Sequence, residues 1–232
     1  MHDFEVISFD CYGTLIDWES GILAAMQPVI EFHELICTSE DVLAAYARGE
    51  SAVEADGWLP YREVLRRTFA SMAKDLGFAP RREELELLEQ ALPRWLPFPD
   101  TVAGLRTLKT AGHRLVIISN VDDDLFARTA TRLGVDFDAV VTAAQAKHYK
   151  PHPGMFELAI ARLGVPAPRF LHAAQSRFHD IATAKQLGMQ TVHVVRDAGR
   201  SGGATPWIED DERTRPDATV ADLAGLVALV GA

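Results

Sequence analysis

Short apolar runs recur along the chain, and most of them are rich in β-branched residues. They are FEVISF (4–9), HRLVIIS (113–119), FDAVVTA (137–143), RFLHAA (169–174) and QTVHVV (190–195). Such near-continuous apolar strands are typical of a parallel sheet that is covered on both faces. Helical patterns that end on a glycine lie between several of the runs, over residues 101–112, 123–134 and 154–164. This alternation predicts βαβ units, and hence an α/β fold with a mostly parallel sheet.

The alternation is interrupted after the first apolar run. Residues 19–93 contain about four segments with helical spacing and no strand pattern. We therefore expect a helical subdomain over residues 18–97, inserted into a core that comprises residues 1–17 and 98–232. The proline-rich stretch LPFPD (96–100) closes this insertion.

The C-terminal part of the chain changes character at residue 197. Residues 197–214 are polar and glycine-rich, which predicts a loop. The following stretch, PDATVADLAGLVALV (216–230), predicts a short edge strand and a closing helix.

Composition narrows the possible partners. The 232 residues carry a formal net charge of −10 and no long basic run, which argues against nucleic acid or an anionic membrane as the main partner. An anionic small substrate would need a local cationic pocket. The two cysteines, Cys11 and Cys37, are interpreted as thiols in a reducing compartment. With no basic signal segment and no apolar run of membrane-spanning length, the sequence predicts a cytoplasmic location.

Polar side chains stand where the predicted strands end. Ligands of open parallel sheets bind beyond the carboxyl ends of the strands, so these positions are candidates for a site. The candidates are Asp10 with Thr14 after the first run, Ser119 and Asn120 after the second, Lys150 after the third, and Asp180 after the fourth. Each is ordinary alone, since an aspartate after a strand is most often a cap or turn residue. Together they predict an active site with two carboxylates and one ammonium group.

The motifs FDCYGTL, ISN, YKP and HD, in this order and with a helical insertion after the first, resemble those of the haloacid dehalogenase superfamily of hydrolases. The resemblance covers nearly the whole chain. It implies a Rossmann-like core with a helical cap over the site. It also implies that Asp10 is a covalent nucleophile, that Lys150 neutralises charge, and that the protein forms a homodimer.

Two positions depart from the phosphatases that make up most of this superfamily. Those enzymes have an aspartate, which protonates the leaving alkoxide, where this chain has Tyr12. They have a metal-binding aspartate where this chain has Gln175. An unperturbed tyrosine has a pKa of about 10 and is a poor acid at neutral pH, and a neutral amide is a weak Mg²⁺ ligand. We therefore expect no cofactor, with Mg²⁺ required only if the protein is a phosphatase.

A halide leaving group would make both departures harmless, because halide leaves as an anion and needs no proton. The 2-haloacid dehalogenase branch has a tyrosine at the position of Tyr12. By this resemblance, Asp10 displaces halide from carbon 2 of a short 2-haloalkanoic acid with inversion. Water, oriented by Asp180 with help from Asn120 or His179, then hydrolyses the ester and releases a 2-hydroxy acid.

The chain also departs from that branch. The branch has serine, asparagine and tryptophan at the positions of Gln175, Arg177 and His179, and a tyrosine at that of Phe156. Arg177 is a candidate anion-binding residue because it lies beside Asp180 in the motif. For His179, the roles of base and of packing residue both stay open.

The arginine of the cap in that branch has no clear match here. Arg48 is the nearest candidate, whereas Arg62 and Arg66 flank an apolar helical stripe and are expected to be solvated. Trp18 and Trp58 either wall the pocket or, as the more ordinary interpretation, pack inside the cap.

The predicted catalytic residues are thus Asp10, Lys150 and Asp180. The predicted substrate-binding positions are Cys11, Tyr12, Thr14, Ser119, Asn120, Arg177, His179 and Arg48. Cys11 is included by its place in the first motif only, since neighbours alternate in an extended chain and its side chain should face away from Asp10. Three hypotheses follow: a metal-independent 2-haloacid dehalogenase, a phosphatase with an unusual acid, and a non-catalytic protein that binds a small anion or another protein. The third is disfavoured because the complete set of polar strand-end residues is present.

Overall fold

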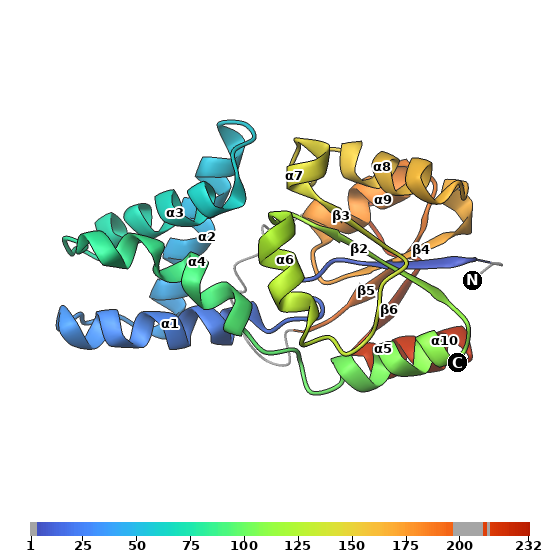
Figure 1. Ribbon diagram of the computed structural model, residues 1–232, viewed down its shortest axis with the longest axis horizontal. Helices are drawn as coiled ribbons and strands as arrows, with labels where there is room; N and C mark the ends of the chain where they lie inside the picture. The colour runs from blue at the N-terminus through green and yellow to red at the C-terminus, as the bar shows by residue number, and fades with distance from the viewer. Residues whose placement is uncertain (1–3, 197–210, 213) are drawn as a thin grey trace.

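The computed structural model describes residues 4–196, 211–212 and 214–232. Within these residues, the centre is a six-stranded parallel sheet with the order β3-β2-β1-β4-β5-β6 (Figure 1). Along the chain the strands are β1 (Val6–Phe9), β2 (Arg114–Ser119), β3 (Ala139–Thr142), β4 (Phe170–Ala174), β5 (Gln190–Val194) and β6 (Ala218–Val220). The predicted α/β fold with a parallel sheet is confirmed. The predicted loop at 197–214 lies largely outside the described residues.

Strand β1 lies in the middle of the sheet. Val6 pairs with Arg114 of β2 on one side and with Phe170 of β4 on the other. All four residues of β1 are buried, which explains why its sequence is nearly continuously apolar rather than alternating. The carboxyl end of β1 therefore lies at the centre of one edge of the sheet, where the neighbouring strands β2 and β4 also end.

The core helices cover both faces of the sheet, with α8 and α9 on one face and α5 and α10 on the other (Figure 1). They are α5 (Thr101–Thr110), α6 (Asp123–Ala130), α7 (Ala143–Ala146), α8 (Gly154–Leu163), α9 (Ala182–Gln186) and α10 (Leu223–Val230). Helix α8 ends at Gly164 in the left-handed conformation, as its sequence predicts. Helix α6 ends at Ala130, and the chain passes through a turn before Gly134.

The segment between β1 and α5 has helices as its regular elements, and it lies beyond the carboxyl edge of the sheet (Figure 1). It contains α1 (Trp18–Phe32), α2 (Ser39–Ala55), α3 (Tyr61–Asp75) and α4 (Leu87–Ala91), with 3-10 turns at Arg82–Glu86 and Leu92–Arg94. We call this segment the cap. Its boundaries at 18 and 97 stay a prediction.

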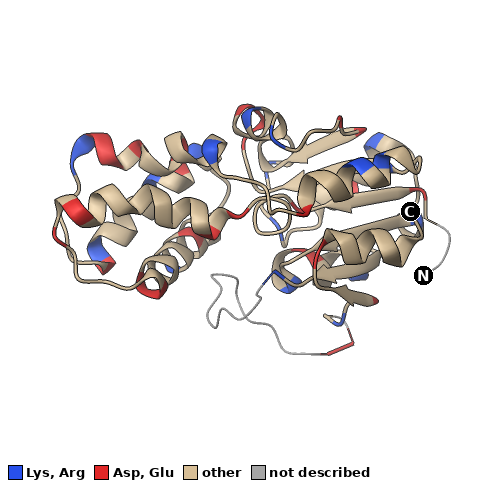
Figure 2. Cartoon of the chain, turned by 90° about the horizontal axis from the view of Figure 1, so that it is seen from below, with Lys and Arg blue, Asp and Glu red and all other residues tan. Residues whose placement is uncertain are grey.

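The cap has its own packed interior. Ile22 and Met26 of α1 and Leu65, Phe69 and Met72 of α3 are fully buried. Burying a side chain of this size contributes about 1.5–3 kcal/mol, so the cap helices hold together largely through this apolar contact. Charged residues of both signs are spread over the cap and the core (Figure 2). In the part of the chain that the structure describes, no helix has the length and apolar character needed to cross a bilayer.

Several hydrogen bonds join the cap to the core, and two contacts hold the start of the cap helix α3. The Asp122 carboxylate, at the start of α6, accepts hydrogen bonds from the backbone N–H groups of Tyr61 (2.9 Å) and Arg62 (3.2 Å). It thereby satisfies free donors at the N-terminus of the cap helix α3. The Tyr149 hydroxyl donates to the carbonyl of Leu59 in the loop before that helix. Both contacts hold the start of α3 against core loops that border the site.

Candidate active site

Asp10 follows the last residue of β1 and sits at the carboxyl edge of the sheet, 8% exposed. The chain turns at Gly13 with φ +96°, a backbone conformation that residues other than glycine rarely adopt. This turn brings Thr14 back beside Asp10, where its hydroxyl donates to Asp10 Oδ2 at 2.7 Å. The backbone N–H of Gln175 donates to Thr14 Oγ1 at 2.9 Å, which leaves the hydroxyl proton free to point at Asp10.

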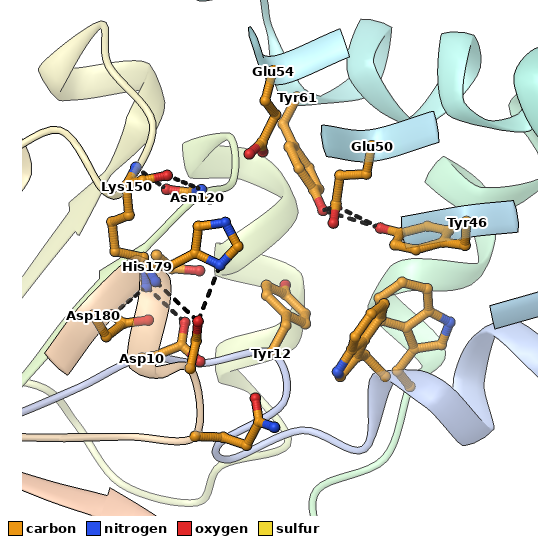
Figure 3. Close-up of a pocket in the computed structure, with 15 residues that line it drawn as sticks. Asp10, Tyr12, Tyr46, Glu50, Glu54, Tyr61, Asn120, Lys150, His179 and Asp180 are labelled. Carbon is orange, nitrogen blue, oxygen red and sulfur yellow. Dashed lines mark hydrogen bonds and ion pairs between the residues drawn. The ribbon is translucent and has the colours of Figure 1, made fainter. Parts of the chain in front are cut away.

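Lys150 joins the two carboxylates of the site (Figure 3). Its Nζ lies 2.8 Å from Asp10 Oδ1, 2.7 Å from Asp180 Oδ1 and 3.0 Å from the carbonyl oxygen of Ile118. Burial alone would lower the pKa of the ammonium, but attraction to Asp10 and Asp180 raises the pKa above its ordinary value. Lys150 is therefore a permanent cation at neutral pH, and its three N–H donors are all used.

Asp180 is held as a carboxylate. Burial would raise its pKa, but the charge of Lys150 and a hydrogen bond with His172 lower the pKa below its ordinary value. His172 Nε2 lies 3.0 Å from Asp180 Oδ1, and His172 Nδ1 lies 2.9 Å from the hydroxyl of Ser8. Asp180 Oδ2 is buried and has no hydrogen-bond partner among the described residues. One oxygen of an ionised aspartate is thus available in the cavity to accept a proton or orient a water molecule.

Asp10 acts as a double acceptor, because Lys150 occupies one of its oxygens and Thr14 the other. Burial raises the pKa of Asp10, and the Lys150 charge acts against this rise. Since both neighbours donate their protons, the arrangement suits the ionised form of Asp10. An ionised carboxylate with fixed orientation at the rim of a cavity is chemically able to act as a nucleophile.

The end of β2 contributes Ser119 and Asn120. Asn120 Oδ1 accepts from the backbone N–H of Lys150 at 2.8 Å, so this side chain holds the loop that carries the ammonium group. The Ser119 hydroxyl is 1% exposed, lines the cavity and has no partner among the described residues. It is therefore available to bind a substrate atom.

Tyr12 and His179 also line the cavity. The Tyr12 hydroxyl lies 2.8 Å from Thr129 Oγ1 of α6, and burial raises the pKa of Tyr12 well above its ordinary value. Tyr12 therefore stays protonated and is engaged by Thr129. Burial lowers the pKa of His179 to about 4, with the Asp180 charge acting in the opposite direction. The imidazole is consequently neutral at pH 7, and its Nδ1 lies 3.1 Å from the Ser176 hydroxyl.

The structure brings together Asp10, Tyr12, Thr14, Ser119, Asn120, Lys150, His179 and Asp180 of the predicted residues. The structure shows further cavity residues that the sequence analysis missed. The cap supplies Tyr46, Glu50 and Glu54 from α2, Tyr61 from α3, and Trp95, and the core adds Ser176. His172, which was also missed, does not line the cavity but orients Asp180. The spacing of four between Tyr46, Glu50 and Glu54 marks one helix face and was the available signal. The cavity is small, about 90 Å³.

Arg48 is not at the cavity, contrary to prediction. Its side chain is 62% exposed, and its guanidinium pairs with Asp75 at 3.0 Å. Arg48 lies two positions from both Tyr46 and Glu50, which corresponds to a rotation of about 200° around the helix. The face of α2 that carries those two residues borders the cavity, so Arg48 points to the opposite side.

Cys11 and Arg177 do not border the cavity either. Cys11 follows Asp10, so its side chain lies on the other side of the backbone, fully buried in the apolar core. This burial raises the pKa of its thiol. The Arg177 guanidinium donates to the carbonyl of Thr214, at 3.3 Å from Nη2. It therefore contacts the C-terminal part of the core rather than the cavity.

Two arginines and two tryptophans of the cap differ in their surroundings. Arg62 forms an ion pair with Asp124 at 2.7 Å, and both Arg62 and Arg66 are largely exposed, as expected. Trp18 lines the same cavity as Asp10, whereas Trp58 lines a neighbouring one. For Trp18, the less ordinary of the two interpretations therefore applies.

Comparison with known proteins identifies the family. The model of the haloacid dehalogenase-like hydrolases matches residues 4–188 of the chain. The chain belongs to the haloacid dehalogenase-like hydrolase family. It is 32% identical to the probable phosphatase IndB of Dickeya dadantii over 82% of this chain and 80% of the relative. It is 30% identical to (S)-2-haloacid dehalogenase 4A of Burkholderia cepacia over 81% of both chains.

Solved structures support the same fold. The L-2-haloacid dehalogenase of Xanthobacter autotrophicus superposes with a TM-score of 0.82 and 24% identity, covering 98% of both chains. The resemblance predicted from the motifs around Asp10 and Lys150 is thereby confirmed at the level of the hydrolase family. Because relatives named as phosphatases and as dehalogenases both match, the family alone does not distinguish a phosphate ester from a carbon–halogen bond as the target.

The donor set at Asp10 does not fit the Mg²⁺ site of a phosphatase. Both oxygens of Asp10 are already occupied, by Lys150 and by Thr14. Gln175 offers a neutral amide, which is a poorer Mg²⁺ ligand than a carboxylate. Across residues 4–196, 211–212 and 214–232, no cluster of three or more His, Cys, Asp or Glu side chains could hold a metal ion.

Proposed function

We propose that this hydrolase cleaves carbon–halogen bonds through a covalent Asp10 ester. The observation that carries the proposal is the state of Tyr12. In place of an acidic proton donor, the chain has a phenol that is bonded to Thr129 and whose pKa burial raises well above its ordinary value. A leaving group that departs as a stable anion suits such a site, because no proton needs to be delivered to it.

The first chemical step is a displacement at carbon. A carboxylate oxygen of Asp10 attacks the carbon that bears the halogen, the new C–O bond forms, and halide leaves with the electron pair of the C–X bond. Lys150 and Thr14 hold the carboxylate in one orientation, which reduces the entropy lost on reaching the transition state. Attack from the side opposite the halogen inverts the configuration at carbon.

The second step is hydrolysis of the ester. A water molecule gives a proton to Asp180 Oδ2 and attacks the carboxyl carbon of Asp10. The bond between that carbon and the alkyl oxygen then breaks, and the alkoxide takes up the proton to give an alcohol. One water is consumed and one halide and one proton are released in each cycle. The available Oδ2 and the ionised state of Asp180 support its role as the base.

The proposed substrate is a short 2-haloalkanoate, which yields a 2-hydroxy acid. The small cavity suits a molecule of few atoms. Ser119 Oγ, which has no partner among the described residues, is placed to donate a hydrogen bond to the substrate carboxylate. We also propose that turnover needs no metal ion, because the residues around Asp10 do not fit a Mg²⁺ site.

Isotope labelling tests the nucleophile. After several turnovers of 2-chloropropionate in ¹⁸O-labelled water, the peptide that contains Asp10 should carry the label, because solvent oxygen enters Asp10 during ester hydrolysis. If Asp10 merely activated water, the label would pass directly to the product. An unlabelled peptide after demonstrated product formation would therefore rule out the covalent mechanism.

A phosphatase is the second candidate, and the identity to a probable phosphatase favours it. Release of phosphate from p-nitrophenyl phosphate, measured with and without Mg²⁺ beside halide release from 2-chloropropionate, separates the two. Halide release that is independent of Mg²⁺ supports the proposal. Mg²⁺-dependent phosphate release without halide release would replace it with the phosphatase. Loss of both activities would point to the non-catalytic binding protein.

A further inference from the structure

The cap presents two carboxyl groups to the cavity. Tyr46, Glu50 and Glu54 lie one helical turn apart on α2 and form a stripe along the face that borders the site. Figure 3 shows the carboxyl groups of Glu50 and Glu54 pointing from the cap toward the cavity, across from Asp10 and Lys150. The side of the cavity that faces the cap is therefore acidic.

Glu50 is held in place by two tyrosine hydroxyls of the cap. Its Oε1 accepts hydrogen bonds from the hydroxyl of Tyr46 at 2.7 Å and from the hydroxyl of Tyr61 at 2.6 Å. Tyr46 in turn contacts the ring of Trp18, with ring centroids 5.2 Å apart. Such donors orient a carboxylate without neutralising its charge. The position of Glu50 is thus fixed from two helices, as expected for a binding group rather than for a solvated surface residue.

The described part of the chain offers these glutamates little positive charge: that of Lys150 reaches Glu54 and acts against the rise in its pKa. Neither forms an ion pair among the described residues, although neither is exposed. Lys150 is the only lysine or arginine that lines the cavity in the described part of the chain, and its three N–H groups are used by Asp10, Asp180 and Ile118. Carboxylates removed from water are normally paired with a cation. A cationic ligand would supply the partner that the described residues do not.

Other groups in the cavity point to a ligand independently of these acids. Ser119 Oγ, Trp95 Nε1 and Asp180 Oδ2 line the cavity, are nearly inaccessible and have no hydrogen-bond partner among the described residues. Aromatic rings complete the wall, since Trp18 and Trp95 border the same space. Aromatic faces beside carboxylates attract ammonium groups through cation–π and ionic contacts together.

We propose that the cap half of the cavity binds a positively charged group, so that the preferred substrate is a 2-haloalkanoate with an amino group further along its chain. This inference rests on the dehalogenase function proposed above. The substrate carboxylate would lie toward Ser119 in the core, and the ammonium group would lie toward Glu50 and Glu54 in the cap. The site would thus recognise a zwitterion rather than a simple anion.

Binding of an ammonium group should change the protonation of the two glutamates. Burial raises the pKa of Glu50, and burial together with the Glu50 charge raises that of Glu54 well above its ordinary value. A bound ammonium group favours the ionised forms and lowers both values again. Binding of the amine should therefore release protons, which titration calorimetry detects as a dependence of the heat on the buffer.

The test compares halide release from 4-amino-2-chlorobutanoate and 2-chlorobutanoate. We expect kcat/KM to be at least about tenfold higher for the amino compound, as one buried ionic contact supplies. Glu50→Gln and Glu54→Gln should each reduce this preference by about tenfold. Glu86→Gln, at an exposed position of the cap, is the matched control and should leave the preference unchanged. A preference near one, or one that survives both cavity variants, would overturn the inference.

A binding measurement keeps the inference testable if neither compound is turned over. Propylammonium, propanol and propionate are titrated into the wild-type protein and into the two cavity variants, in two buffers of different ionisation enthalpy. Saturable binding of propylammonium alone, with proton release and weakened by Glu50→Gln, supports the cationic subsite even if the dehalogenase function fails. Equal binding of propanol, tighter binding of propionate, or no binding of propylammonium would refute the subsite. Halide release separately decides the proposed function.

Discussion

Replacing Lys150 by methionine should destabilise the protein, because it leaves two buried carboxylates without a cation. Lys150 is 3% exposed, and its Nζ lies 2.8 Å from Asp10 and 2.7 Å from Asp180. Removing one partner of a buried ion pair typically costs about 3–5 kcal/mol. Since domains have total stabilities of about 5–15 kcal/mol, we expect the variant to fold with a markedly lower free energy of unfolding. Its turnover should fall by a factor of about a hundred or more.

The loss of stability should depend on pH. In the Lys150→Met variant, repulsion between Asp10 and Asp180 raises the folded-state pKa of one carboxyl above its value in the unfolded chain, which is about 3.9. A raised folded-state pKa means that stability is present below the unfolded pKa and is lost as the pH rises through the folded pKa. The difference between wild type and variant should therefore be smaller at about pH 5 than at about pH 8.

Urea denaturation, followed by the fluorescence of the tryptophans, measures this difference at both pH values. The control is Lys109→Met, which removes an ion pair with Asp138 of similar length, 2.6 Å, whose lysine is 35% exposed. That variant should lose no more than about 1 kcal/mol at either pH. If Lys150→Met lost the same amount at both pH values, or as little as the control, the buried carboxylate pair would not be the cause.

Three further predictions concern the metal, His179 and Gly13. Halide release should be unchanged by EDTA and by added Mg²⁺, and activity lost in EDTA and restored by Mg²⁺ would contradict the metal-free proposal. The pKa of His179 is about 4 in the folded protein, whereas that of an unfolded histidine is about 6.5. Between these two pH values the unfolded chain binds a proton that the folded protein does not, so the free energy of unfolding should fall by about 3 kcal/mol as the pH is lowered through this range. His179→Gln should remove this loss in acid denaturation curves, whereas curves that stay parallel to wild type would contradict it. Gly13→Ala should destabilise by about 1–3 kcal/mol and lower turnover, because φ is +96° and the new Cβ would lie 3.0 Å from Trp18 Nε1. Gly112→Ala, with φ +91° and open space around the Cβ, is the control, and an equal loss in both variants would assign the effect to backbone strain alone.

The core half of the site was predictable from the sequence because of the sheet. Asp10 and Asp180 follow strands β1 and β4, and Ser119 is the last residue of β2; these strands are parallel neighbours, and parallel strands end at one edge. Three separated motifs must then meet, whatever the detail of the intervening helices. The contacts of Lys150 with both carboxylates follow from the same geometry, with the ammonium brought in by the loop after β3.

The cap half was not predictable in this way. A helix such as α2 carries polar residues all round, so its sequence alone does not say which face meets the core. Arg48 is the nearest match to the cap arginine of the dehalogenase branch, but the helix turns Glu50 and Glu54 to the cavity instead. The orientation depends on packing between α2, α1 and α3, and on the hydroxyl of Tyr61 that fixes Glu50. None of these contacts is local in the sequence.

The contacts of Asp122 and Tyr149 with the start of α3 limit how freely the cap can be exchanged. Asp122 follows closely after Asn120, and Tyr149 directly precedes Lys150, so both anchor points belong to core loops that border the cavity. A chimera that received only a foreign cap would lose the partners of these anchors and would disturb the lysine loop. Transplanting residues 18–97 together with matched residues at 122 and 149 should preserve the donor activity better. The two parts of this enzyme would then be inherited as a pair rather than as independent modules.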